Sequence, residues 1–348
     1  EDMATNASHD AGIWRIPEGE AIYAAALRSN TTTTLSAEDI HALGLAEVAR
    51  IEKEMDAILD AEGLTEGSVG ARARALAADP KHLFANDDAG RAAMLDYLRE
   101  LNAALMEQAD EFFITLPTQP LEIVRVPPYA ENGSAGGYYQ AAALDGSRPG
   151  RFYINQKDTA DNPRWVLPTL LYHEAAPGHH FQVSVGQLIE DVPLLRRMSP
   201  FSAYTEGWAL YAERVAAVDM NLYALDPLGN LGRLNDEMFR AVRLVVDTGM
   251  HHKRWSREQS IEFMLAHTSN SAADVEREIE RYVVWPGQAT AYKVGQLAML
   301  RCRERAQAAL GDRFDLRAFH ELVLMNGAMP LDILERTVDA WIKEQQAS

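Results

Sequence analysis

Apolar residues return at helical spacing along much of the chain. From Ile40 to Leu59 they recur every three or four positions, as on the buried face of an amphipathic helix. Ser36, followed three positions later by Asp39, resembles a capping box and predicts the start of this helix. Further helices are expected over three shorter segments: 19–28, 71–78 and 87–113.

The pattern changes between residues 119 and 158. Segments 122–128 and 150–155 are rich in β-branched and aromatic residues and predict short strands, separated by a glycine-rich stretch and a turn. Helical patterns then continue to the end. The sequence therefore predicts a mainly α fold in a single region (1–348), with a helical lead-in at 1–118, a small β-sheet or hairpin at 119–158, and a helical core at 159–348.

Composition limits the classes of partner. Among 348 residues, 51 Asp and Glu against 33 Lys and Arg give a net charge of −18, which disfavours nucleic acid and anionic lipid as partners. No apolar run approaches the roughly 20 residues needed to span a bilayer. The chain begins with neither Met nor the pattern of a signal peptide, so we expect a processed or truncated product.

A single cysteine, Cys302, excludes an intramolecular disulfide and a thiolate-rich zinc site. Any metal must therefore be held by histidine and carboxylate. Histidine is uncommon here, with ten in the chain, and three of them fall within eight positions. This cluster is the strongest chemical signal in the sequence.

The segment 173–180 reads His-Glu-Ala-Ala-Pro-Gly-His-His and departs from the His-Glu-x-x-His zinc motif. On a straight helix, His179 would lie roughly 120° away from the face of His173. His180 would share that face, but about 10.5 Å further along. Because Pro177-Gly178 can bulge or kink a helix, either histidine can join His173 at a metal ion.

A third ligand is expected from the apolar helical segment 204–213. Glu206 and Glu213 are seven positions apart and share one helix face. We expect Glu206 to bind the metal and Glu213 to orient a histidine ring or cap a charge. The alternative is that both carboxylates form structural ion pairs with arginines. Two histidines and one carboxylate leave one zinc position open for water.

The segment 173–182 resembles the His-Glu-x-x-Pro-Gly-His-x-x-Gln signature of the bacterial DUF885 family, a group placed with the gluzincin metallopeptidases. The resemblance runs from about Gly12 almost to the last residue. Family members carry a further N-terminal helical portion, so this chain looks like the C-terminal part. Four more segments are similar to family blocks: 206–213, 247–255, 286–296 and 326–331.

The resemblance implies zinc ligands His173, His179 and Glu206, with Glu174 as the general base. It also implies a long-helix fold like that of the M3 and M32 peptidases, with a small β-element beside the zinc helix. An extended peptide could pair with the edge of such a sheet. The implied activity is hydrolysis of a peptide or small amide by zinc-activated water.

Other residues are candidates for supporting roles. Tyr292 is the leading donor to the developing oxyanion, followed by His251, Tyr138 and Tyr139. Asp247, four positions before His251, is expected to pair with it or to support a ligand. His180 and Gln182 are expected beside the ligands. Arg243 and Lys293 are candidates for binding a substrate carboxylate. Each of the tyrosines, and the two cations, also has a plain packing or surface interpretation.

Two other functions fit the same residues. One is a metal-dependent hydrolase acting on an ester or a non-peptide amide. The other is a non-catalytic binding protein, for which four protein ligands would close the metal site. Related bacterial proteins look exported, so the resemblance favours the periplasm over the cytoplasm.

Overall fold

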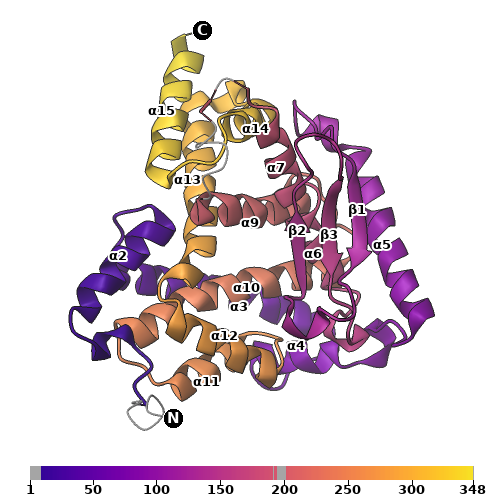
Figure 1. Cartoon of the computed structure of the whole chain (residues 1–348), viewed down its shortest axis with the longest axis vertical. Coiled ribbons are helices and arrows are strands. Elements are labelled where there is room, and N and C mark those ends of the chain that lie inside the picture. Colours follow the sequence, from indigo (N-terminus) through magenta and orange to yellow (C-terminus); the bar gives the residue numbers. More distant parts are fainter. Residues whose placement is uncertain (1–8, 191, 194–200, 348) are drawn as a thin grey trace. The chain divides into compact units, whose positions relative to one another are not determined.

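The computed structural model describes residues 9–190, 192–193 and 201–347. The chain divides into two compact units, each assembled from two separate parts of the sequence (Figure 1). Unit 1 contains the described residues up to Leu76 and Leu234–Val294. Unit 2 contains Ala77–Arg233 and the described residues from Gly295 onward. Two of the three boundaries fall inside long helices, α10 (Pro227–His251) and α13 (Ala291–Leu310).

Unit 1 is helical. Its helices, besides parts of α10 and α13, are α2 (Gly19–Thr31), α3 (Ala37–Ala61), α4 (Val69–Ala77), α11 (Arg257–His267) and α12 (Ala272–Val284). The predicted capping box at the start of α3 is confirmed, because Asp39 N donates to Ser36 Oγ at 3.1 Å and Ser36 N donates to the Asp39 carboxylate at 3.0 Å. Ile40, Ile51 and Leu59 are fully buried along one face of α3, as their spacing predicts.

Unit 2 contains the remaining helices and the sheet. Its helices, besides parts of α10 and α13, are α5 (Asp88–Met106), α6 (Leu167–Glu174), α7 (His179–Gln187), α9 (Ser202–Val218), α14 (Leu316–Met325) and α15 (Leu331–Ala347). Short 3-10 helices occur in both units, at Ile13–Arg15 and Gln288–Thr290 in unit 1 and at Pro80–His82, Ala109–Glu111, Glu131–Gly133, Thr159–Asp161 and Gly311–Arg313 in unit 2. The predicted mainly helical class with a small sheet is confirmed for the described residues.

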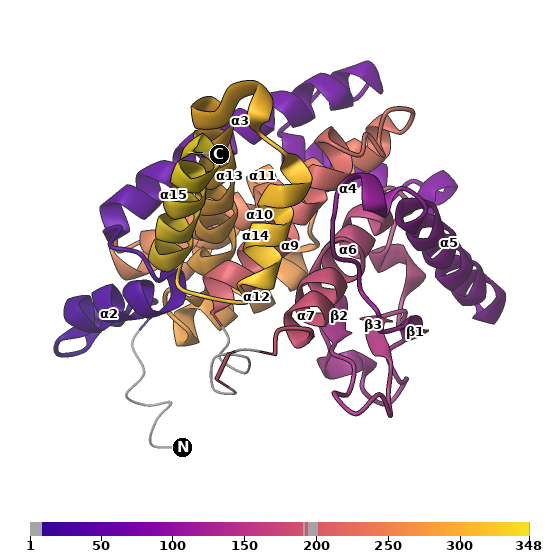
Figure 2. The same ribbon diagram turned by 90° about the horizontal axis from the view of Figure 1, so that it is seen from above.

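The three strands of the sheet all lie within the predicted β-region. They are β1 (Leu121–Arg125), β2 (Gly137–Gln140) and β3 (Gly150–Ile154), in the order β1-β3-β2. β3 pairs in parallel with β1 and antiparallel with β2. Helix α5 contacts β1 and helix α6 contacts β2, so both outer strands adjoin helices of the same unit (Figure 2).

Packing within unit 2 brings α6, α7 and α9 together. Helix α9 contacts both α6 and α7, and its side chains Trp208, Leu210 and Tyr211 are fully buried. Because α9 is apolar around most of its circumference, a carboxylate on it requires a polar partner. No helix in the described part of the chain is both long enough and apolar enough to cross a membrane.

Candidate metal centre

The His-Glu pair lies at the end of a helix rather than in the middle of one. Helix α6 ends at Glu174, and α7 begins at His179 after a turn that contains a cis Ala176-Pro177 peptide bond. The expectation of one kinked or bulged helix is therefore wrong in detail. The turn separates two helices, and this allows His179 to point in a direction that no continuation of α6 would permit.

Gly178 is required in this turn because the backbone folds back on itself. A Cβ atom at Gly178 would lie 1.9 Å from the carbonyl oxygen of His173 and 2.4 Å from that of Tyr172. No side chain can be accommodated against two backbone oxygens at such distances. The glycine therefore allows α7 to begin directly beside the end of α6.

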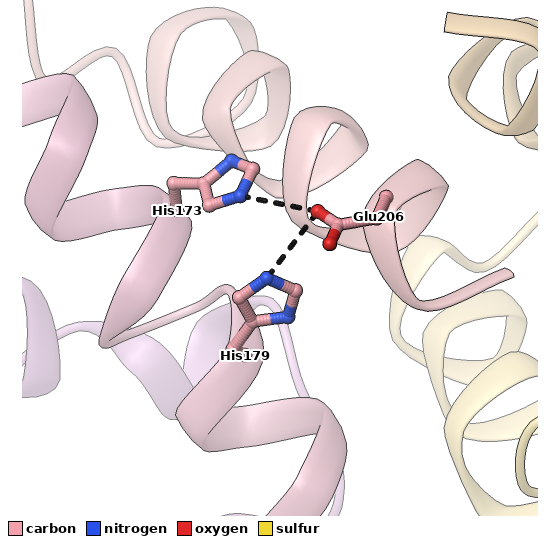
Figure 3. A group of neighbouring side chains, drawn as sticks. All are labelled: His173, His179 and Glu206. Atoms are coloured by element: carbon pink, nitrogen blue, oxygen red, sulfur yellow. Dashed lines mark ion pairs between the residues drawn. The ribbon is translucent and has the colours of Figure 1, made fainter. Parts of the chain in front are cut away.

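His173, His179 and Glu206 converge from three helices, α6, α7 and α9. Their side chains point toward one another (Figure 3), with both histidine Nε2 atoms 3.5 Å from Glu206 Oε2. One ligand-type atom from each residue lies within 4.8 Å of the other two. Zinc with ligands at about 2.0–2.1 Å in tetrahedral geometry separates those ligands by about 3.3 Å. The two separations of 3.5 Å are close to this value, so the three residues are placed to share one metal ion.

The charges in the cluster are strongly coupled. Burial alone would lower the pKa of His173, but its hydrogen bonds to Glu206 and Glu213 raise the pKa to about 10. Burial opposes ionisation of Glu206, yet the two histidines hold the pKa of its carboxyl below its usual range. Without a metal, the cluster therefore carries a proton on His173 that a cation would displace.

Glu213 fixes the orientation of His173. The His173 Nδ1–H donates to Glu213 Oε1 at 2.7 Å, and both residues are almost fully buried. This bond leaves Nε2 of the same ring directed at Glu206. A carboxylate behind a histidine is a common arrangement around protein metal ions, because it fixes the ring and makes the free nitrogen more basic.

Two of the three side chains in the cluster are partly exposed to solvent. The His173 side chain is only 4% exposed, whereas that of His179 is 15% and that of Glu206 is 23% exposed. The group of potential ligands found among the described residues contains these three and no fourth. An ion bound by three protein atoms retains a position for water or substrate.

Glu174 follows the first histidine directly and is 8% exposed. Its negative charge lies close enough to His173 to contribute to the raised pKa of that ring. In the described part of the chain, no hydrogen bond or ion pair engages the Glu174 carboxylate. The Glu174 carboxylate thus lies next in sequence to a member of the His/Glu cluster and has no protein partner among the described residues.

His180 points away from the cluster. Its Nδ1 and the Tyr139 hydroxyl share a hydrogen bond of 3.1 Å, and burial lowers the pKa of His180 to about 4. The choice between His179 and His180, open in the sequence, thus falls on His179. Gln182 is buried on α7, and in the described structure its side-chain oxygen has no hydrogen-bond partner.

The two tyrosines of β2 face opposite sides of the sheet, as neighbouring strand positions do. Tyr139 faces inward to His180, whereas Tyr138 stacks on Tyr153 with ring centroids 4.9 Å apart. Tyr138 is 37% exposed. Only Tyr139 is therefore connected by direct contact to the segment that carries the histidines.

Five of the sequence candidates belong to unit 1 rather than to the unit that contains the metal cluster. Asp247 and His251 lie near the end of α10. Asp247 accepts from the Tyr23 hydroxyl at 2.6 Å and from Gly287 N, while burial raises the pKa of its carboxyl. His251 Nδ1 accepts from Ile13 N, and Nε2 donates to the carbonyl of Tyr282, each at 3.0 Å. Both ring nitrogens are thus occupied by backbone, which favours a packing role for His251.

The remaining three candidates are Arg243, Tyr292 and Lys293. Arg243 lies over the Tyr292 ring, 4.6 Å from its centroid, and donates to the Glu278 carboxylate. Lys293 is fully buried and pairs with Glu237 at 2.6 Å. These contacts favour structural ion pairing for both cations.

Trp208 is a residue that the sequence did not single out. Its indole Nε1–H donates to the carbonyl oxygen of Pro177 at 3.0 Å, in the turn before His179. Its position two residues after Glu206 was the available signal. The acceptor is a backbone atom, however, and sequence patterns do not identify such partners.

The chain belongs to the family described as "Bacterial protein of unknown function (DUF885)", which it matches over residues 1–338. None of the curated proteins matches its sequence. The structure is similar to that of a putative lipoprotein from Colwellia psychrerythraea, with 45% identity and a TM-score of 0.96. That match covers 99% of this chain and 58% of the other.

A second solved structure, a putative lipoprotein of unknown function from Shewanella oneidensis, has 21% identity and a TM-score of 0.79. The match covers 96% of this chain and 61% of the other, and at this identity it shows the fold alone. The chain thus spans about three fifths of the length of each of these relatives.

Proposed function

We propose that the chain is the zinc-binding part of a metallohydrolase of the gluzincin type, acting on peptides or small amides. The observation that carries this proposal is the convergence of His173, His179 and Glu206, with Glu174 next to the first histidine in the chain. Two imidazoles and one carboxylate form a ligand set used by catalytic zinc sites.

Each group at the site has a separate role in the proposed reaction. Zinc, when bound, would act as a Lewis acid and lower the pKa of a bound water molecule. The Glu174 carboxylate accepts the proton from the attacking water and delivers it to the leaving nitrogen. Glu213 keeps His173 oriented throughout, through the buried 2.7 Å bond to Nδ1.

The position of the small sheet favours a peptide as the substrate. β2 is an outer strand, its partner is β3, and it contacts α6, the helix that carries His173 and Glu174. An extended peptide that pairs with such an edge gains main-chain hydrogen bonds without regard to its side chains. The fold would accordingly be of the long-helix M3 and M32 type. The net charge of −18 favours neutral or basic peptides.

The test is a comparison of metal content and hydrolysis in variants of the 348-residue chain. Glu174→Gln should retain zinc and lose nearly all hydrolysis of a mixed peptide library, because the amide cannot accept the proton. His173→Ala should lose both zinc and activity. The matched control is Glu321→Gln on α14, whose carboxylate accepts from Thr115 and lies outside the proposed machinery.

Wild-type turnover by Glu174→Gln would refute the assigned base. A panel that includes esters and non-peptide amides identifies the bond that is cleaved. Activity restricted to esters would retain the metal chemistry and remove the peptidase assignment.

The chain is also proposed to be part of an exported protein, because both solved relatives are described as putative lipoproteins. Fractionation of cells that produce the natural protein tests this. Recovery only in the cytoplasmic fraction would contradict it.

A further inference from the structure

We infer that Trp208 is a positioning residue that holds the second histidine in place for the metal. This inference rests on the proposed zinc site. The indole Nε1–H donates to Pro177 O at 3.0 Å, and Pro177 lies two residues before His179. Trp208 is thus hydrogen-bonded to the turn that sets the direction of the His179 side chain.

Helix α9 supports each of the three ligands in a different way. It supplies Glu206 directly, and Glu213, about two turns later, orients His173 through a bond of 2.7 Å. Trp208 fixes the turn that leads to His179. Because all three contacts come from one helix, the spacing between the ligands is set by the geometry of α9.

The indole itself is firmly held. Trp208 is fully buried, and its ring contacts those of Tyr211, His320 and Phe113 at centroid distances of 5.6, 5.8 and 6.5 Å. Tyr211 Oη is hydrogen-bonded to His320 Nε2 at 2.9 Å, which links two of these rings. A side chain enclosed in this way cannot turn its N–H to another acceptor without disturbing the cluster.

Breaking the hydrogen bond between Trp208 and Pro177 would cost free energy. If it broke, a buried N–H group and a buried carbonyl would both lack a partner. The turn also has little freedom elsewhere, since Gly178 already lies against the backbone of His173. The bond from Trp208 therefore restrains the turn at Pro177, next to the close approach at Gly178.

A second contact connects α7 with α9 and does not depend on the indole N–H group. Phe181 on α7 packs against Phe113 at 4.8 Å, and Phe113 contacts the indole. Trp208→Phe removes the hydrogen bond and keeps an aromatic ring in the cluster. This difference allows positioning of His179 to be separated from packing of the core.

The experiment compares zinc affinity, measured by competition with a chromophoric chelator, in Trp208→Phe and in a matched control. The control is Tyr204→Phe, which also removes a buried donor of α9, here the hydroxyl that donates to Val323 O at 2.6 Å. We expect Trp208→Phe to weaken zinc binding about tenfold, the scale found for residues that support metal ligands. Tyr204→Phe should bind zinc like the wild type.

A double-variant comparison locates the effect. In a His179→Ala background, Trp208→Phe should cause no further loss of zinc affinity, because the ligand that it positions is already gone. In a Glu213→Gln background it should cause its full loss, since Glu213 acts through His173. Equal losses in both backgrounds would overturn the assignment to His179.

A second variant separates loss of the N–H donor from a general defect in folding. β-(3-Benzothienyl)alanine introduced at position 208 retains the shape of the indole and lacks the N–H donor. It should also weaken zinc binding about tenfold, while the thermal unfolding of the metal-free chain changes little more than in Tyr204→Phe. Wild-type zinc affinity in this variant refutes the inference alone. Failure of the wild type to bind zinc refutes the proposed function.

Discussion

Replacing Glu213 tests how far the metal centre depends on a residue that does not touch the metal. Glu213 is 1% exposed and accepts the His173 Nδ1–H at 2.7 Å. Glu213→Gln keeps an oxygen acceptor of the same size at this position and removes the charge. Glu213→Ala removes the acceptor as well and leaves His173 free to rotate.

The expected loss follows from these two contributions. Residues behind a ligating histidine contribute roughly ten- to a hundredfold in metal affinity, or about 1.4–2.8 kcal/mol. Gln should fall near the lower figure, because the orientation of the ring survives. Ala should fall near the upper figure, because both the orientation and the charge are lost.

The assay is zinc competition with a chelator of known affinity, with thermal unfolding recorded for each metal-free variant. Glu321→Gln on α14 again provides the control for loss of a carboxylate elsewhere in unit 2. The reasoning is supported if the wild type binds zinc most tightly, Glu213→Gln less tightly and Glu213→Ala least tightly. If both Glu213 variants bind zinc as tightly as the wild type, the proposed role of this carboxylate is refuted.

Two further predictions concern charge. The pKa of His173 is raised from 6.5 to about 10 in the metal-free fold. The proton on His173 therefore stabilises the fold fully below pH 6.5, and this contribution is lost as the pH rises toward 10. Because zinc must displace this proton, zinc affinity should rise by up to about tenfold per pH unit over that interval, and a flat pH series in chelator competition would contradict this. Lys293→Met should lower the free energy of unfolding by roughly 1–3 kcal/mol, because Glu47 and Glu237 lose a buried partner while Arg50 still pairs with Glu237. A raised KM with unchanged denaturant unfolding would instead support the substrate-binding interpretation of Lys293.

Local signals in the sequence predicted the features that depend on neighbouring residues. Ser36 and Asp39 identified the start of α3, because a capping box is made within one turn. The proline and the helix-forming residues before His173 indicated that it lies on a helix, which is α6. Residue chemistry proposed Glu206 as a metal ligand and Glu213 as a group that orients a histidine ring, and both carboxylates lie beside His173. The structure brings these side chains together.

Features that depend on backbone contacts or on distant parts of the chain could not be predicted in this way. β2 has four residues directly after a glycine-rich stretch, and its pairing with β3 supplies the order that its own sequence lacks. The break between α6 and α7 depends on how closely Gly178 approaches the backbone of His173. The Trp208 bond ends on a carbonyl oxygen, which every residue possesses.

The candidates in unit 1 have well-defined protein partners in the structure. Tyr292 and His251 were expected as donors to the oxyanion, Asp247 as a support for a ligand or for His251, and the two cations as partners of a substrate carboxylate. In the structure His251 bonds to two backbone groups, and Lys293 lies buried against Glu237. Buried polar side chains need partners in any protein, so their chemistry alone does not separate a site from a well-paired core.

The most direct test of the central claim is a crystal structure of the zinc-loaded chain, with anomalous scattering recorded on both sides of the zinc absorption edge. We predict one strong anomalous peak about 2.0–2.1 Å from the Nε2 atoms of His173 and His179, and about 2.0–2.2 Å from a carboxylate oxygen of Glu206. Stoichiometric zinc located elsewhere, with these three side chains unliganded, would contradict the account.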